Sequence, residues 1–399
     1  MNGARLALAP APGEAHDFAA LVERLHAIGR EVIAPAAAEV DRDARFASEA
    51  LAALKQERLL SAYVPVEFGG MGLDVTQVSR LCEALGQYCA STAMIFAMHQ
   101  IQAACIVHHG GSSAFFRDYM REMAAKQNLL ASATTELGVG GDVRSSLCAA
   151  KVVDDHFILE KQAPVISYGE QADAILVTCR RAEDAPKSDQ VLVLVRKEDA
   201  ILRRLSEWDT LGFRGTCSPG FELKSIGRAE QILPEPYAAI HARTQHPFAH
   251  IVWASLWAGL AADALQRARQ FVRAEARKTP DATPINATRL AEADVVLNTL
   301  RCTLRDTLED YQRALQGDGE AFASFGFAIR VNNLKLTASA LLLDVVMRAM
   351  MILGISGYRN DSKLTLGRHL RDAIGAGLMV NNDRILGQNA TMHVALREA

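Results

Sequence analysis

The sequence predicts an α+β protein that is mostly α-helical and has three successive parts. Apolar residues recur at three- and four-residue spacing up to about residue 126 and again after about residue 248, which indicates helices. Between these regions, short runs rich in Val, Ile and Leu alternate with polar turns, which indicates strands. We therefore expect an N-terminal helical domain at 1–126, a middle β-domain at 127–240 and a C-terminal four-helix bundle at 241–399.

The N-terminal domain is expected to consist of short helices. The apolar spacing over 18–33 predicts the first of them, and Ser48 is suited to cap the next, because its hydroxyl can accept a hydrogen bond from a free amide. The glycine-broken stretch 65–73 predicts a turn. Two further helices are expected at 91–109 and 112–126.

The middle region is expected to hold short strands separated by polar loops. The polar segment 183–189 predicts an exposed loop. The apolar runs that predict strands are 151–153, 156–159, 174–178, 191–195, 221–223 and 231–233.

The C-terminal region is expected to form four long helices with short connections, at 248–278, 286–315, 321–354 and 364–396. Short connections place consecutive helices antiparallel, so the region predicts an antiparallel bundle.

Charge and composition exclude several classes of function. The chain carries 43 basic and 46 acidic side chains, a net charge of −3, so we expect no nucleic-acid partner.

The apolar run 338–355 contains Asp344 and Arg348, which favours a buried bundle helix over a membrane span. The start of the chain lacks the apolar stretch of a signal peptide. The 7 cysteines form no CxxC pair, so neither a zinc site nor a disulfide framework is indicated and a cytoplasmic location is expected.

The segment 131–142, Ala-Ser-Ala-Thr-Thr-Glu-Leu-Gly-Val-Gly-Gly-Asp, carries the strongest functional signal. Thr134 and Thr135 offer hydroxyls after a predicted strand, while Gly140 and Gly141 permit close approach to the backbone. A flavin needs donors and acceptors for its ring and backbone amides for its pyrophosphate, and this segment can supply both. Taken alone, the segment is also consistent with a plain glycine turn.

Four segments in this order resemble the acyl-CoA dehydrogenase superfamily of flavoproteins over nearly the whole chain. They are 65–72 (PVEFGGMG), 131–142, 165–169 (VISYG) and 368–373 (RHLRDA). The resemblance implies FAD as the cofactor or, in the oxygenase branch of the superfamily, FMN supplied in the reduced state.

The resemblance also implies which residues bind the flavin. Thr135 matches a threonine beside the flavin pyrimidine ring, and Gly140 and Gly141 match a pair that contacts the pyrophosphate. Ser167 matches a hydroxyl residue near N5, and Val165 stands where the family usually has a tryptophan against the ring.

Two more positions imply an oligomer. Gly354 begins a loop that resembles one meeting the adenosine half of the flavin across a subunit interface. Arg277, or Arg273 nearby, resembles an arginine that reaches a neighbouring subunit's cofactor. The resemblance therefore implies a homodimer or homotetramer.

The catalytic glutamate of the resembling family is missing, because direct counting puts Val380 at its position. Candidate replacements are Asp383, one helical turn further on, His250, near an alternative base position in the first bundle helix, and His99. Each also has a structural interpretation, as a surface carboxylate for Asp383 and as core histidines for the other two.

Three functions are compatible with these features. The first is α,β-dehydrogenation of an acyl thioester, on CoA or a carrier protein, with an atypical base and with an electron-transfer flavoprotein as electron acceptor. The second is a monooxygenase that receives reduced flavin from a flavin reductase. The third is a catalytically inactive relative that binds a ligand, because a fold resemblance does not fix the function.

Overall fold

A computed structural model describes residues 17–140, 142–278, 283–317 and 319–395. It has the predicted layout, with a helical N-terminal part, a β region and a helical C-terminal part, so the predicted fold class is confirmed. Helices give way to strands between α6 and β1, and they return at α7. We propose to keep 1–126, 127–240 and 241–399 as the domain division, since these changes fall near its boundaries.

The N-terminal part is built from helices around the almost completely buried α5. Asp17 starts the first helix by accepting hydrogen bonds from the amides of Ala19 and Ala20. Ser48 is the first residue of its helix rather than the cap, a position that Ala47 occupies. The α-helices are α1 (Phe18–Ile28), α2 (Ala34–Arg42), α3 (Ser48–Gln56), α4 (Val75–Gly86), α5 (Ala90–His109) and α6 (Ala114–Lys126), with a π-helical turn, η1 (Gly29–Ile33), between α1 and α2.

The β region contains two sheets. The three-stranded sheet, in the order β1-β4-β5, consists of β1 (Leu130–Ala133), β4 (Ala174–Arg180) and β5 (Gln190–Arg196). The four-stranded sheet, in the order β2-β3-β7-β6, consists of β2 (Lys151–Val153), β3 (His156–Ala163), β7 (Phe221–Arg228) and β6 (Ala200–Arg204). The predicted strand at 231–233 is instead a 3-10 turn, Ala229–Gln231, followed by a single bridge from Ile232 to Val193.

β1 is short but sets up the candidate site. It pairs in parallel with β4, Leu130 opposite Ala174 and Ala133 opposite Val177. Its sequence, Leu-Ala-Ser-Ala, is poor in β-branched residues, so pairing with β4 stabilises it more than its own β-propensity does.

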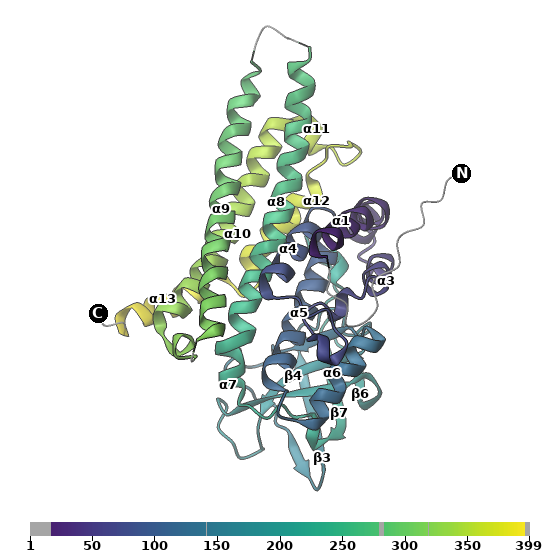
Figure 1. The fold of residues 1–399 in the computed structure, drawn as a ribbon, viewed down its shortest axis with the longest axis vertical. Helices are drawn as coiled ribbons and strands as arrows, with labels where there is room; N and C mark the ends of the chain where they lie inside the picture. The colour runs from purple at the N-terminus through teal and green to yellow at the C-terminus, as the bar shows by residue number, and fades with distance from the viewer. Residues whose placement is uncertain (1–16, 141, 279–282, 318, 396–399) are drawn as a thin grey trace.

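The C-terminal bundle is dominated by α8 (His246–Ala276), α9 (Ile285–Gln316) and α10 (Phe325–Leu353), which lie side by side (Figure 1). Smaller helices are α7 (Tyr237–Ile240), α11 (Ile355–Tyr358), α12 (Gly367–Leu378) and α13 (Asn382–Ala395), and a π-helical turn, η7 (His241–Gln245), leads into α8. The fourth predicted helix is therefore broken between α12 and α13, where Val380 has a φ of 46°. A β-branched residue rarely adopts that left-handed conformation, so the helix cannot continue through it.

α4 and α8 cross with almost no space between their backbones. A Cβ on Gly259 of α8 would lie 2.0 Å from the carbonyl oxygen of Glu83, and one on Gly86 would lie 2.2 Å from that of Leu256. The two glycines therefore allow a helix contact that a side chain at either position would prevent.

α12 joins the three parts of the molecule. Asp372 is buried and accepts a 2.6 Å hydrogen bond from the amide of Phe213 in the β region, and burial raises its pKa to about 6. Arg371 forms an ion pair with Asp41 of α2. The Arg-His-Leu-Arg-Asp segment is thus bound to both preceding parts of the chain.

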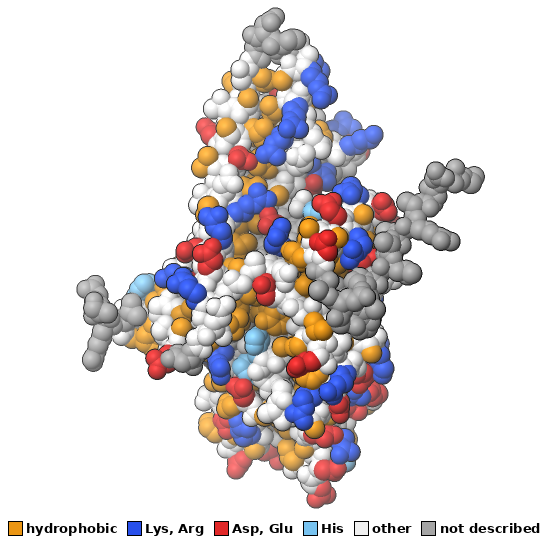
Figure 2. All heavy atoms as spheres, in the orientation of Figure 1, with side chains coloured by type: hydrophobic (Ala, Val, Ile, Leu, Met, Phe, Trp, Pro, Cys, Tyr) orange, Lys and Arg blue, Asp and Glu red, His pale blue; other side chains and the backbone are white. Residues whose placement is uncertain are grey.

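Three described helical stretches are long and apolar enough to cross a membrane by length and composition: α5, Tyr237–Ala276 and α10. The first two are 89% and 83% buried over their most apolar window, whereas α10 is only 44% buried. Exposed apolar side chains follow its outer face and the turn after it, including Met347, Met351 and Ile355. On the face shown in Figure 2, acidic and basic side chains are interspersed.

Candidate active site

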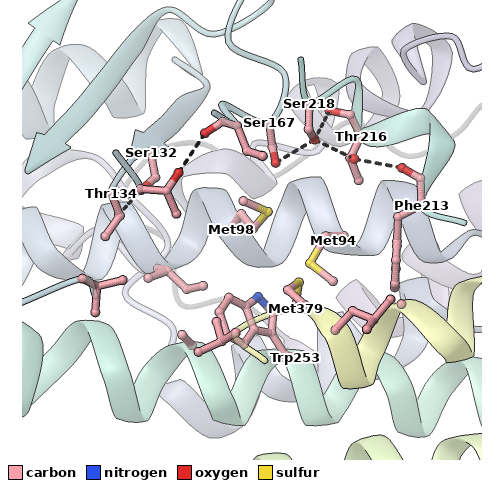
Figure 3. Close-up of a pocket in the computed structure, with 18 of the residues that line it drawn as sticks. Met94, Met98, Ser132, Thr134, Ser167, Phe213, Thr216, Ser218, Trp253 and Met379 are labelled. Atoms are coloured by element: carbon pink, nitrogen blue, oxygen red, sulfur yellow. Dashed lines mark hydrogen bonds between the residues drawn. The ribbon is translucent and has the colours of Figure 1, made fainter. Parts of the chain in front are cut away.

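A cavity of about 630 Å³ lies where the three parts meet. α5 contributes Met94, Met98, Ile101 and Gln102, and η7 and α8 contribute His241, Gln245, His246, Ala249, His250 and Trp253. The β region lies on another side, and Ile374, Leu378, Met379 and Val380 close it from α12 and the turn after it. Figure 3 shows α5 and α8 facing each other across this space. Among the described residues that line it, none is an aspartate or glutamate.

Hydroxyl groups from the β region line one wall of the cavity. Thr134 and Thr135 follow the carboxyl end of β1, and Ser132 Oγ lies 2.8 Å from Thr134 Oγ1. Thr135 Oγ1 donates to the carbonyl of Val165 at 3.4 Å, which ties the two predicted flavin segments together. Ser167 Oγ accepts from Ser218 Oγ at 2.8 Å (Figure 3). Of the predicted flavin residues, Thr134, Thr135, Val165 and Ser167 therefore share this cavity.

The glycine turn after β1 leaves its backbone accessible. Gly138 and Gly140 have φ of 90° and 61°, and a Cβ on Gly140 would meet nothing within 4 Å. The Arg384 side chain donates to the carbonyl of Gly140. Gly141 lies outside the described residues. Exposed backbone beside a row of hydroxyls and an apolar cavity fits the ring and phosphate needs of a flavin.

Five aromatic side chains follow one another along the bundle side of the cavity, in the order Tyr237, His241, His246, His250 and Trp253. Ring centroids of His241 and His246 lie 5.4 Å apart and stacked, those of His246 and His250 4.5 Å apart and edge-on, and those of His250 and Trp253 5.8 Å apart. Within the described residues, no group of three His, Cys, Asp or Glu is arranged to hold a metal ion.

Burial keeps these histidines neutral. Desolvation, with His246 next and Lys335 further on, holds the pKa of His250 well below 6.5, and desolvation lowers that of His241 to about 3. His250 Nδ1 donates to the carbonyl of Val331 at 3.1 Å, because a carbonyl can only accept. In the neutral ring, Nε2 then carries the lone pair and is free to accept a proton or a hydrogen bond.

We expect acid to unfold this protein more readily because of the histidine row. Below the unfolded pKa of 6.5, the unfolded chain takes up protons that the folded chain leaves off, so stability falls as the pH drops toward the folded pKa values. For the buried His250 the loss is at most about 1.4 kcal/mol per pH unit. Thermal unfolding followed from pH 7 to pH 5 checks this: His250→Gln is expected to flatten the dependence. The exposed His156→Gln serves as the control, and an equal slope in all three proteins would contradict the expectation.

Val380, at the position of the family's glutamate, does line the cavity. Its carbonyl accepts a 3.3 Å hydrogen bond from Lys335 Nζ, which also donates to Asn382 Oδ1 at 2.6 Å. Lys335 is fully buried, and burial lowers its pKa to about 8. This lysine anchors the turn that separates α12 from α13.

The other two base candidates lie outside the cavity lining. Asp383 is exposed in the first turn of α13. His99 is buried in the fold, where Nε2 donates to the carbonyl of Leu60 at 2.6 Å and Nδ1 accepts from the amide of Leu130 at 3.0 Å. Of the three candidates, only His250 lines the cavity. The role of Asp383 as the base stays a prediction.

Arg277 and Gly354 are not brought to the cavity by this chain. Arg277 is exposed just past the end of α8, and Gly354 is exposed between α10 and α11. Both lie toward the end of the bundle remote from the β region (Figure 1). Their predicted contacts are with the cofactor of a neighbouring chain, and those contacts stay a prediction.

Several lining residues were missed by the sequence interpretation. Met94, Met98 and Ile101 recur on α5 at helical spacing, but such a stripe is the normal pattern of any core helix. Gln102 beside that stripe was the available signal, since a polar side chain next to buried apolar positions is unusual.

The fold and the cavity together define a flavin-dependent oxidoreductase. Two family profiles match the chain: "Acyl-CoA dehydrogenase, N-terminal domain" over residues 16–127 and "Acyl-CoA dehydrogenase, C-terminal domain" over residues 226–378. The chain belongs to the acyl-CoA dehydrogenase superfamily.

Individual relatives and solved structures agree with this assignment. The chain is 26% identical over 366 residues to cyclohex-1-ene-1-carbonyl-CoA dehydrogenase of Syntrophus aciditrophicus, covering 88% of this chain and 84% of that protein. Butyryl-CoA dehydrogenase from Megasphaera elsdenii has a similar fold, with a TM-score of 0.79, 19% identity and coverage of 96% and 99%. FMN-bound TdsC from Paenibacillus sp. A11-2 has a TM-score of 0.82, 17% identity and coverage of 96% and 98%. At these identities the two structures show the fold alone.

Proposed function

We propose that this protein uses FAD to oxidise an acyl thioester, carried on CoA or on a carrier protein, to its α,β-unsaturated form. One observation supports this most: the hydroxyls of Thr135 and Ser167, the imidazole of His250 and the position of the family's glutamate all border one largely apolar cavity. An acyl chain suits such a cavity, because burial of its methylene groups stabilises the complex by about 0.8 kcal/mol each.

Different residues of the chain would bind the flavin and accept the proton. Thr134, Thr135 and Ser167 would hold the flavin ring with Val165 against it, and the turn at Gly140 would hold the pyrophosphate. When bound, the flavin supplies the acceptor for a hydride from the substrate β-carbon. His250 Nε2 would take the α-proton, so that the C–H electrons left behind form the new C=C bond. The Val331 carbonyl fixes the tautomer that makes this possible.

An anaerobic titration of the flavin-loaded protein with saturated acyl-CoAs of graded chain length tests the proposal. We expect the absorbance band of the oxidised flavin to bleach with at least one member, because only hydride transfer from the substrate reduces the flavin in the absence of another donor. A flavin that stays oxidised with every acyl-CoA and with the matching acyl-carrier proteins would reject the dehydrogenase proposal.

A second candidate function is supported by the absence of any carboxylate among the described lining residues. A monooxygenase that receives reduced flavin, as FMN or FAD, from a flavin reductase needs no base for an α-proton. For this candidate, added reductase, a nicotinamide donor and oxygen would give an oxygenated product from a small apolar substrate. A chain that binds ligands but reacts in neither assay would instead be an inactive relative.

We also propose that a second copy of the chain covers the outer face of α10 and that the protein works as a homodimer or homotetramer in the cytoplasm. The support is the apolar surface at Met347, Met351 and Ile355, together with the exposed Arg277 and Gly354 at the same end of the bundle. A copy of the chain suits this surface better than a membrane, since charged residues such as Arg348 lie along the same helix. As a dehydrogenase it would pass its electrons to an electron-transfer flavoprotein.

A further inference from the structure

Gln102 is a buried polar side chain in the cavity wall that the fold leaves without a partner. It is 3% exposed, it lines the cavity beside Met98 and Ile101, and its Oε1 has no hydrogen bond. On the face of α5 that meets the cavity, the other lining residues are apolar.

The other buried glutamines of the described chain are each held by the fold, although the Oε1 atom of Gln100 also lacks a partner. Each makes at least one hydrogen bond: Gln100 to the carbonyl of Leu59, Gln127 to Ser61, Gln190 to Ser146, Gln231 to the carbonyl of Leu194, and Gln245 from the hydroxyl of Tyr237. Within the described residues Gln102 makes none, so its amide does not hold the fold together.

A buried amide without a partner destabilises a folded protein, because it has given up its hydrogen bonds to water. Methionine or isoleucine, as found on the same face of α5, would avoid that loss. A ligand group in the cavity that forms a hydrogen bond with the Gln102 amide restores a missing bond.

A second polar atom in the wall lacks a partner. Trp253 Nε1 on α8 is buried and has no hydrogen-bond acceptor among the described residues. Figure 3 shows the Trp253 indole on α8 with its nitrogen on the side toward α5. A hydroxyl group both donates and accepts, so it can pair with an unpartnered amide or with an unpartnered indole N–H.

We propose that the substrate carries a hydroxyl group on its buried part and that Gln102 selects for it over an unsubstituted hydrocarbon chain. This inference rests on the proposed acyl-thioester activity and narrows its substrate class to hydroxylated acyl groups. A site built to bond a hydroxyl rejects the analogue that lacks it far more strongly than an apolar pocket rejects an additional one.

Binding of matched ligands tests this without turnover when the flavin is reduced beforehand, because a reduced flavin cannot accept a hydride. Hexanoyl-CoA is compared with its 4-, 5- and 6-hydroxy derivatives by anaerobic calorimetry on the flavin-loaded protein. We expect at least one hydroxylated ligand to bind about 10-fold more tightly than hexanoyl-CoA. Gln102→Met, which keeps the length and removes the polar group, is expected to abolish the preference, while Gln100→Met on the same helix, outside the cavity lining, keeps it.

A ligand-free readout tests the same idea. Gln102→Met is expected to raise the Tm of the flavin-loaded protein by a few degrees, since it removes a buried amide without a partner. An absence of preference for every hydroxylated ligand, or a preference that survives in Gln102→Met, overturns the proposal. Loss of flavin from Gln102→Met also overturns it, because Gln102 would then serve the cofactor. The binding comparison can be interpreted even if no acyl-CoA reduces the flavin, so the two proposals are tested separately.

Discussion

His250→Gln is expected to lower kcat for acyl-thioester oxidation by about 10²–10⁴-fold while leaving the flavin bound. The substitution keeps a side chain that can donate to the carbonyl of Val331, but it removes the nitrogen lone pair that would take the α-proton. Flavin content and the Tm of the loaded protein should stay near those of the parent, because the predicted flavin residues lie on the opposite wall. Stopped-flow reduction of the flavin by the best acyl-CoA measures the effect directly.

The chain offers a control and a rescue for that experiment. Asp383→Asn alters an exposed carboxylate outside the cavity lining, and we expect it to keep turnover. Val380→Glu, added to His250→Gln, puts a carboxylate at the family's usual position and should restore part of the rate. If Asp383→Asn loses activity and His250→Gln does not, the proton goes to Asp383 and our assignment of the base is wrong.

Gly259→Ala is expected to destabilise the fold by about 2–3 kcal/mol, although alanine favours helices more than glycine does. The new Cβ would lie 2.0 Å from the carbonyl oxygen of Glu83, so α4 and α8 would have to separate. Because both helices belong to the main core, Tm should fall by roughly 4–12 °C.

The same substitution at Gly387 has the opposite expected sign. This glycine is exposed within α13, and a Cβ there would meet nothing within 4 Å. Gly387→Ala should therefore leave Tm unchanged or raise it slightly, through helix propensity alone. Thermal denaturation of both variants tests the two expectations. A Gly259→Ala protein with the Tm of the parent would show that the close helix crossing does not exist in solution.

The sequence predicted the long elements well because their hydrophobic periods are sustained. α8, α9 and α10 begin and end within a few residues of their predicted bounds. The bounds of elements that depend on tertiary context were predicted less closely. β1 exists because it lies beside β4, and α12 ends where Val380 adopts a left-handed conformation that Lys335 and its neighbours hold in place.

The candidate site could be predicted only in part, for physical reasons. Thr134, Thr135 and Ser167 lie near one another along the chain or on paired segments, so local motifs located them. His250 and Asp383 could not be ranked from sequence, since burial and the direction of a side chain decide which one meets the cavity. The position of Gln102 beside an apolar stripe was visible in the sequence, but its lack of a hydrogen-bond partner depends on how the chain packs around it.

The length of α8 has a consequence for mixed oligomers of two differently inactivated variants of this protein. Trp253 borders the cavity and Arg277 follows the end of the same helix, which places them about 36 Å apart at 1.5 Å per residue. A flavin site that uses both must therefore draw them from different chains. Two inactive variants, one altered at His250 and one at Arg277, would then repair each other when co-expressed, because mixed assemblies contain one intact site.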